Sequence, residues 1–116
     1  MEIKLRRLGA LWVIDVTGDM DLYNAFKVKN IVNTMIERKI REYVINLEKV
    51  EYMDSSGIGA LLYVFAELKK RGMLLRIAGV KGSVKRVIEL TKLLGYLPLS
   101  AGVSEAIVEI RRTGSS

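Results

Sequence analysis

Apolar and polar residues alternate at the start of the chain, as in a strand with one buried face. Residues 3–6 (Ile-Lys-Leu-Arg) keep this two-residue period. Residues 8–10 predict a tight turn around Gly9, and the apolar run 11–16 predicts a second strand. We expect these two strands to pair as an antiparallel hairpin. Residues 18–21 then interrupt the strand pattern and lead into a helix.

Helical periodicity predicts four helices in the rest of the chain. Their apolar positions are Val28, Ile31, Val32, Met35 and Ile36 in the first, Leu61, Leu62, Phe65 and Leu68 in the second, Val84, Val87, Ile88 and Leu90 in the third, and Ala106, Ile107 and Ile110 in the fourth. Gly72, which follows three cationic residues, predicts the end of the second helix. Ser83 and Ser104 are expected to cap the third and fourth helices.

Short apolar runs between these helices predict buried strands. Residues 43–47 and 73–78 are two such runs, and residues 97–99 form a short extended piece that Pro98 confines to a sheet edge. The resulting order is β-β-α-β-α-β-α-β-α. It predicts an α/β fold: a mixed sheet with an N-terminal antiparallel hairpin and parallel later strands, packed by about four helices. We expect a single domain over residues 1–112 and a frayed tail at residues 113–116.

The composition excludes several kinds of chemistry. Among the 116 residues there is no cysteine and no histidine, so disulfides, thiolate metal sites, most zinc sites and a Ser-His-Asp triad are absent. No apolar run approaches the roughly 20 residues that a membrane span needs, and the first residues lack the apolar block of a signal peptide. We therefore expect a cytoplasmic protein without a cofactor, a metal or a membrane partner.

A formal net charge of +6 and a pI of about 9.7 raise the possibility of nucleic-acid binding. The basic residues are scattered, however, and several stand at predicted helix ends, where they complement the helix dipole. They do not alternate with aromatic residues as in an RNA-binding platform. The pattern favours a solvated basic surface without direct contact to nucleic acid.

The segment Asp54-Ser55-Ser56-Gly57-Ile58-Gly59 joins a predicted buried strand to an amphipathic helix. Functional loops gather at this end of the strands in sheets of this kind. One interpretation is that either serine only caps the helix, which contributes about 1 kcal/mol. The other is that one serine accepts a phosphoryl group, which the N-terminus of the helix would hold. The two glycines each cost a helix up to about 1 kcal/mol relative to alanine, so they suit a partner that needs close access to Ser56.

This segment closely resembles the phosphorylation motif of STAS domains (sulfate transporter and anti-sigma factor antagonist). Residues 18–22 are similar to the family's turn before its first helix, residues 44–47 to its central strand and residues 87–91 to its third helix. The resemblance covers nearly the whole chain in the same order and implies the STAS fold. The chain departs from the family at Asn46, where aspartate is more usual, and at Lys92, where glycine is common.

The resemblance implies an anti-sigma factor antagonist that is regulated by phosphorylation of Ser56. In such proteins the unmodified form binds an anti-sigma factor that is also a serine kinase with a histidine-kinase-like ATPase fold, and the sigma factor is released. Phosphorylation ends this binding, and a phosphatase restores it. The resemblance implies that Asp21 lies beside Ser56 and that Asp54 and Ser55 complete the loop, followed by Gly57, Ile58 and Gly59 of the motif. Because they follow on the same predicted helix, Ala60, Tyr63 and Val64 are also expected to face the partner.

Other functions fit the sequence less well. A STAS-type ligand-sensing or transporter-accessory module that binds a nucleotide or a lipid is the alternative. Enzymatic activity is not expected, because no histidine can activate Ser56, and because Asp21 and Asp54 read more simply as helix-dipole partners than as an acid–base pair. We expect a monomer or a weak dimer.

Overall fold

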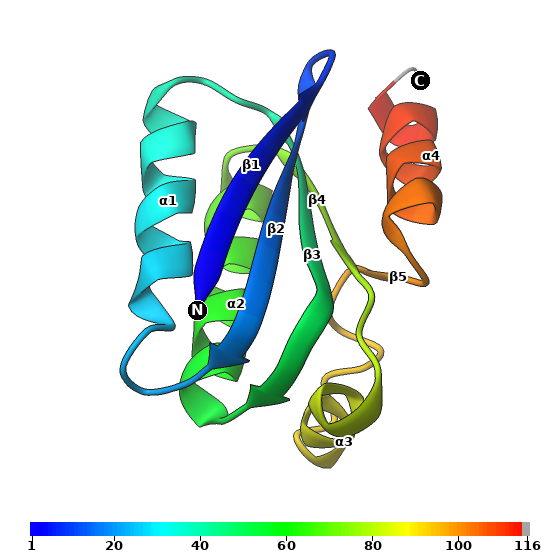
Figure 1. Cartoon of the computed structure of the whole chain (residues 1–116). Coiled ribbons are helices and arrows are strands. Elements are labelled where there is room, and N and C mark those ends of the chain that lie inside the picture. Colours follow the sequence, from blue (N-terminus) through cyan, green and yellow to red (C-terminus); the bar gives the residue numbers. More distant parts are fainter. Residues whose placement is uncertain (115–116) are drawn as a thin grey trace.

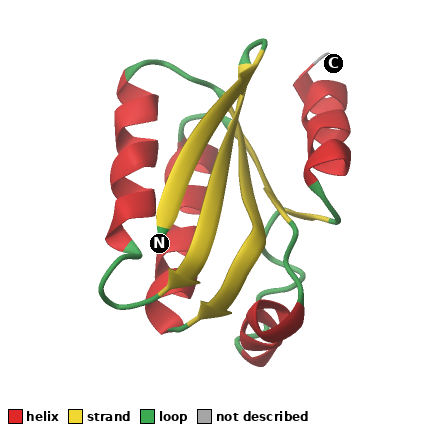
Figure 2. Ribbon diagram, in the orientation of Figure 1, coloured by secondary structure: helices red, strands yellow, loops and turns green. Residues whose placement is uncertain are grey.

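The computed structural model describes residues 1–114, and these form one five-stranded sheet with four helices (Figure 1, Figure 2). The strands lie in the order β1-β2-β3-β4-β5, with β1 and β2 antiparallel and the other neighbours parallel. The mixed α/β fold and the element order predicted from the sequence are confirmed. In chain order the elements are β1 (Glu2–Leu8), β2 (Leu11–Met20), α1 (Phe26–Glu37), β3 (Glu42–Met53), α2 (Ser55–Lys70), β4 (Leu74–Ala78), α3 (Gly82–Leu90), β5 (Leu99–Ser100) and α4 (Val103–Gly114).

Helices α1 and α2 cover one face of the sheet, and the larger core lies between them and the strands (Figure 1). Helix α3 adds Val84 and Ile88 to the same core. On the opposite face, a smaller core packs Ala106 and Ile110 of α4 against β2, β3 and β4. Here α4 is held by Arg76, whose guanidinium Nε lies 2.8 Å from both the Ser100 hydroxyl and a carboxylate oxygen of Glu109.

Strands β2 and β3 both run further than the sequence predicts. We expected β2 to end at Val16, but it continues to Met20, and β3 continues past Leu47 to Met53. The register between the two strands shifts twice, between Asp15 and Thr17 and between Gly18 and Asp19. Such bulges break the two-residue alternation without ending the strand, so the sequence pattern stops before the pairing does.

Two predicted helix caps are wrong. Helix α3 begins after Lys81, and the Ser83 hydroxyl instead donates to the carbonyl oxygen of Glu51 at 2.5 Å. Helix α4 begins at Val103, one residue before Ser104. The predicted end of α2 is confirmed, because Gly72 follows Arg71 with a φ of +71°, a conformation that glycine adopts without strain.

The structure also changes the expectation for two further segments. Leu90 is 77% exposed, since it lies two positions after the buried Ile88 and therefore on the other side of α3. We expected a frayed tail from Thr113, but α4 extends through Gly114, and Ser115 and Ser116 lie outside the described residues.

Strand β5 follows Pro98 and forms one edge of the sheet, as predicted. Within residues 1–114 no helix is both long and apolar enough to cross a membrane.

Candidate functional site

Asp54 caps helix α2. Its backbone is extended, and its Oδ1 accepts hydrogen bonds from the backbone N–H groups of Ser56 at 2.8 Å and Gly57 at 3.4 Å. Neither serine is therefore the N-cap, and that interpretation of the sequence is wrong. Aspartate and serine are nearly equal as cap residues, so propensity alone could not place the helix start to within one position.

The two hydroxyls at the start of α2 take no part in holding the fold. Ser55 is exposed and Ser56 is half-buried. Within the described part of the chain, neither hydroxyl has a hydrogen-bond partner, whereas Ser83 and Ser100 both use theirs. Ser56 is thus partly exposed, and its hydroxyl is not used by the fold.

The same carboxylate of Asp54 also fixes the neighbouring loop between β2 and α1. Its Oδ2 accepts a hydrogen bond from the backbone N–H of Leu22 at 3.1 Å, and the Asp54 N–H donates to the carbonyl oxygen of Met20 at 3.2 Å. One side chain thereby joins two loops that are far apart in sequence. Both loops follow the carboxyl ends of parallel strands, at the same end of the sheet (Figure 1).

Asp21 stabilises the loop between β2 and α1 through hydrogen bonds within its own turn. Its Oδ1 accepts from the Tyr23 N–H at 2.9 Å, and its own N–H donates to Oδ1 of Asn24 at 2.9 Å. The Asn24 amide in turn donates to the carbonyl oxygen of Asp19 at 2.9 Å. The structure therefore brings the Asp21 loop next to the Ser56 loop, with the Asp21 carboxylate bonded within its own turn.

The two glycines near Ser56 have different reasons to be glycine. A Cβ at Gly57 would lie 2.4 Å from Cγ of Met53 and 3.1 Å from the carbonyl oxygen of Met20. Packing within the fold therefore accounts for Gly57, and access for a partner is not needed to explain it. A Cβ at Gly59 would meet no atom within 4 Å, and the residue is exposed. Access for a partner, which we inferred from both glycines, therefore remains an explanation for Gly59 alone.

Four of the residues expected beside Ser56 or toward a partner are buried, and Gly57 is one of them. Ile58 is 5% exposed, Ala60 is 1% exposed and Val64 is fully buried, and all three pack into the larger core. Their side chains are therefore not part of the surface around Ser56. Tyr63 is 37% exposed and donates its hydroxyl hydrogen to Oδ1 of Asn33 at 3.2 Å, so it links α2 to α1.

An exposed apolar patch beside Ser56 was missed in the sequence. It consists of Leu22, Tyr23 and Phe26, which are 69%, 83% and 49% exposed, and we call it the 22–26 patch. The hydrogen bonds of Asp21 and Asp54 hold the backbone of its loop in place. The available signal was a short apolar pair between polar turn residues that belongs to no helix stripe. Three exposed apolar side chains within five residues make this loop a candidate interaction surface.

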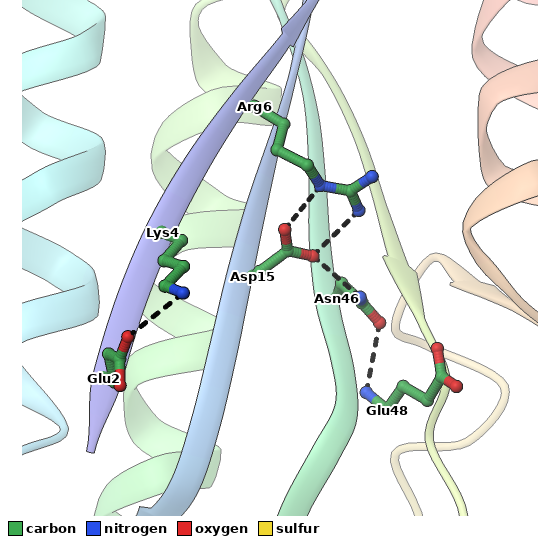
Figure 3. Close-up of polar contacts among 6 residues, drawn as sticks. All are labelled: Glu2, Lys4, Arg6, Asp15, Asn46 and Glu48. Carbon is green, nitrogen blue, oxygen red and sulfur yellow. Dashed lines mark hydrogen bonds and ion pairs between the residues drawn. The ribbon is translucent and has the colours of Figure 1, made fainter.

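A separate polar groove of about 520 Å³ lies on the sheet face that α4 leaves open, over β1, β2 and β3. There the Asp15 carboxylate accepts from Nε of Arg6 at 2.5 Å and from Nδ2 of Asn46 at 2.8 Å (Figure 3). Partial burial raises the pKa of Asp15, but the hydrogen bonds from Arg6 and Asn46 outweigh it and leave the pKa below its ordinary value. The amide of Asn46 fits this position, since an aspartate there would face the Asp15 carboxylate.

The described residues hold no cluster that suggests a metal centre. Among residues 1–114, no three side chains of the histidine, cysteine, aspartate or glutamate type come together as possible ligands. At the carboxyl ends of β2 and β3 lie the unbonded hydroxyl of Ser56, the carboxylate of Asp54 that bridges two loops, and the 22–26 patch. These groups suit recognition by another protein.

Comparisons with known proteins agree with this fold. The family model described as the STAS domain matches residues 2–106. The anti-sigma-B factor antagonist of Staphylococcus aureus is 29% identical over 102 residues, which cover 88% of this chain and 94% of that protein. An anti-sigma factor antagonist from Mycobacterium paratuberculosis has a TM-score of 0.86 at 22% identity, over 95% of this chain and 93% of its own. SpoIIAA, an anti-sigma factor antagonist in its unphosphorylated form, has a TM-score of 0.80 at 22% identity, over 96% and 97%.

Proposed function

The chain belongs to the STAS domain family, and we propose that it acts as an anti-sigma factor antagonist that is switched by phosphorylation of Ser56. In this role it is a binding module and not an enzyme. Its unmodified form binds an anti-sigma factor that is also a serine kinase with a histidine-kinase-like ATPase fold, and the sigma factor is released. A phosphatase restores Ser56, and the exchange takes place in the cytoplasm.

The proposal rests chiefly on Ser56, which is half-buried and whose hydroxyl has no hydrogen-bond partner within residues 1–114. Two relatives support the proposal. The S. aureus protein is an anti-sigma-B factor antagonist, and the structure of SpoIIAA is that of its unphosphorylated form. A hydroxyl that the fold does not use can be modified at little cost to stability.

The 22–26 patch would provide much of the affinity for the partner. Fully burying an exposed leucine or aromatic side chain contributes about 1.5–3 kcal/mol, and such side chains are typical anchors of protein interfaces. Leu22 and Tyr23 lie on a loop that Asp21 and Asp54 already fix, so little backbone order has to be gained on binding. Gly59, bare and exposed, allows the partner to approach α2 closely.

A phosphate on Ser56 would meet a site that is already negative. The N–H groups of Ser56 and Gly57, which we expected to receive the phosphate, are bonded to Asp54 instead. A phosphoserine therefore adds about −1.5 to −2 charges beside a carboxylate. Burying that charge without a cation costs several kcal/mol, and every 1.4 kcal/mol is tenfold in affinity. A loss of hundredfold or more follows with little change of fold.

Repulsion by the phosphate would also act on Asp54 itself. Because the Asp54 carboxylate holds the N–H of Leu22, weakening that contact loosens the 22–26 patch. The modification thus affects both parts of the docking surface, the α2 terminus directly and the patch through Asp54.

The proposal is tested with the kinases of this class from the same genome. The purified protein is incubated with each kinase and ATP, and mass spectrometry locates the phosphate. We expect it on Ser56. Ser56→Ala should bind the kinase and resist modification, and Ser56→Asp should bind at least about a hundredfold more weakly. Ser55→Ala is the matched control and should behave as wild type. A phosphate on Ser55, or unchanged binding by Ser56→Asp, contradicts the proposal.

A further inference from the structure

Strand β1 forms the second edge of the sheet and has an open outer side. It pairs with β2 along its whole length, from Glu2↔Thr17 to Leu8↔Leu11, and is the outermost strand next to α1 (Figure 1). No backbone group from the loops or helices in residues 1–114 bonds to β1. An edge of this length presents unpaired N–H and C=O groups to any extended chain that can lie beside it.

An apolar groove runs along this edge, between β1 and α1. Its volume is about 430 Å³. Ile3 and Leu5 line it from β1 and Ile31 from α1, and Leu5 is 39% exposed. The polar residues of the groove are Lys27, Asn30 and Thr34, so no carboxylate lines it.

The charges along this edge are mostly positive. Lys4 and Arg6 point to the open face of the sheet, where their side chains stay 76% and 50% exposed although Lys4 contacts Glu2 and Arg6 contacts Asp15 (Figure 3). Arg7 is exposed on the same strand. On the groove side, Lys27 forms no ion pair within the described part of the chain.

We propose that the outer edge of β1 binds an extended acidic segment of a partner protein, which adds to the sheet as a further strand. Successive side chains of such a segment point to opposite faces. One set would enter the apolar groove against Ile3 and Leu5, while the other set, being acidic, would lie opposite Lys4 and Arg6. The surface contains neither Ser56 nor the 22–26 patch and is independent of the proposed phosphorylation.

A second copy of the chain fits this edge less well. If two β1 strands paired antiparallel about Leu5, Lys4 would lie opposite Arg6 at two places. If they paired about Lys4, Glu2 would lie opposite Arg6, but the two Lys4 side chains would face each other at the centre. Like charges directly opposite one another destabilise a strand pair. The cations on β1 therefore oppose self-pairing and favour a partner of opposite charge.

The test uses an acetylated and amidated peptide in which valine alternates with glutamate. It is titrated into the full chain while backbone amide chemical shifts are followed. We expect shifts in β1 and in the α1 residues that line the groove, with binding that weakens as salt is added. A peptide in which lysine replaces glutamate should bind at least about tenfold more weakly. No shift in β1 with the acidic peptide, or equal binding of both peptides, overturns the proposal.

Variants place the binding at the edge of β1. Lys4→Glu, at a side chain that would lie opposite the acidic set, should reduce affinity for the acidic peptide about fivefold or more. Lys85→Glu, the same change at an exposed lysine of α3, should leave the affinity unchanged. Ser56→Asp should bind the peptide as wild type does, so the result does not depend on the kinase. If sedimentation finds a dimer that Leu5→Lys abolishes, a second copy occupies the edge and the proposal is wrong.

Discussion

Asp54 binds the backbone of Leu22 across 32 positions of the chain, at 3.1 Å, while its other oxygen caps helix α2. A single carboxylate thereby holds both the Ser56 loop and the loop that carries the 22–26 patch. Oδ1 caps α2 and Oδ2 holds Leu22, so substitutions at Asp54 can separate the helix cap from the bridge between the loops.

Asp54→Asn should keep the cap and lose the bridge. The amide oxygen can still accept from Ser56, but the NH₂ group that replaces the second oxygen cannot accept from the Leu22 N–H. We expect a small loss of stability, clearly faster hydrogen exchange at Leu22 and weaker anti-sigma factor binding. Asp54→Ala, which loses both contacts, should cost about 0.5–2 kcal/mol for the cap alone. Retained protection of the Leu22 amide in Asp54→Asn would show that the bridge does not hold the loop.

Gly57→Ala and Gly59→Ala should change stability in opposite directions. The new methyl group at position 57 collides with Met53, and such overpacking costs about 1–3 kcal/mol. At position 59 it meets open space, and the better helix propensity stabilises α2 by up to about 1 kcal/mol. Urea unfolding measures both. Under the proposed function Gly59→Ala should also bind the anti-sigma factor less well although it is more stable, and stabilisation by Gly57→Ala would contradict the packing argument.

Truncation of the 22–26 patch should affect binding and spare the fold. Leu22→Ala and Tyr23→Ala remove exposed side chains, so each should change the unfolding free energy by no more than about 0.5 kcal/mol. Each should weaken anti-sigma factor binding about tenfold or more, as measured by calorimetry. Leu90→Ala is the matched control, because Leu90 is 77% exposed on α3 and lies outside the patch. An equal loss of binding in Leu90→Ala would remove the special role of the patch.

The Asp15 cluster should give the protein a defined acid sensitivity. The folded-state pKa of Asp15 is lowered, so its ionised form stabilises the fold at pH values above the unfolded pKa of about 3.9, and this contribution is lost as the pH falls through the folded pKa. Asp15→Asn should therefore be less stable than wild type near neutral pH, with the difference shrinking under acid conditions. Urea midpoints over a pH series test this; a difference that is independent of pH would exclude Asp15 as its source.

The periodicity of apolar residues was enough to predict the order and pairing of the elements, because each helix or strand buries its apolar side against the core. The ends of elements were harder. The bulges between β2 and β3 interrupt the alternation while the pairing continues to Met20 and Met53. The cap of α2 depends on which residue first leaves helical geometry, and aspartate and serine are equally able to provide it.

The site was predicted in part. The motif led to Ser56, Asp54 and Gly59, but the directions of Ile58 and Ala60 depend on where α2 begins, and both side chains face the core. The contact of Asp54 with Leu22 could not be found from residue types, since a backbone N–H belongs to nearly every residue. The exposed Leu22 and Tyr23 stand out only when a fold shows that nothing covers them.

The two faces of the sheet are covered by different numbers of helices. Helix α4 fully buries Ala106 and Ile110 in the smaller core, whereas the core that supports α2 and the Ser56 loop is formed by three helices. Val103 and Ile107 add to the smaller core, and Arg76 and Ser100 bind Glu109, so α4 is attached through side chains of its own. Because the two cores share no buried residue, repacking beneath α4 acts on other side chains than those that support the start of α2.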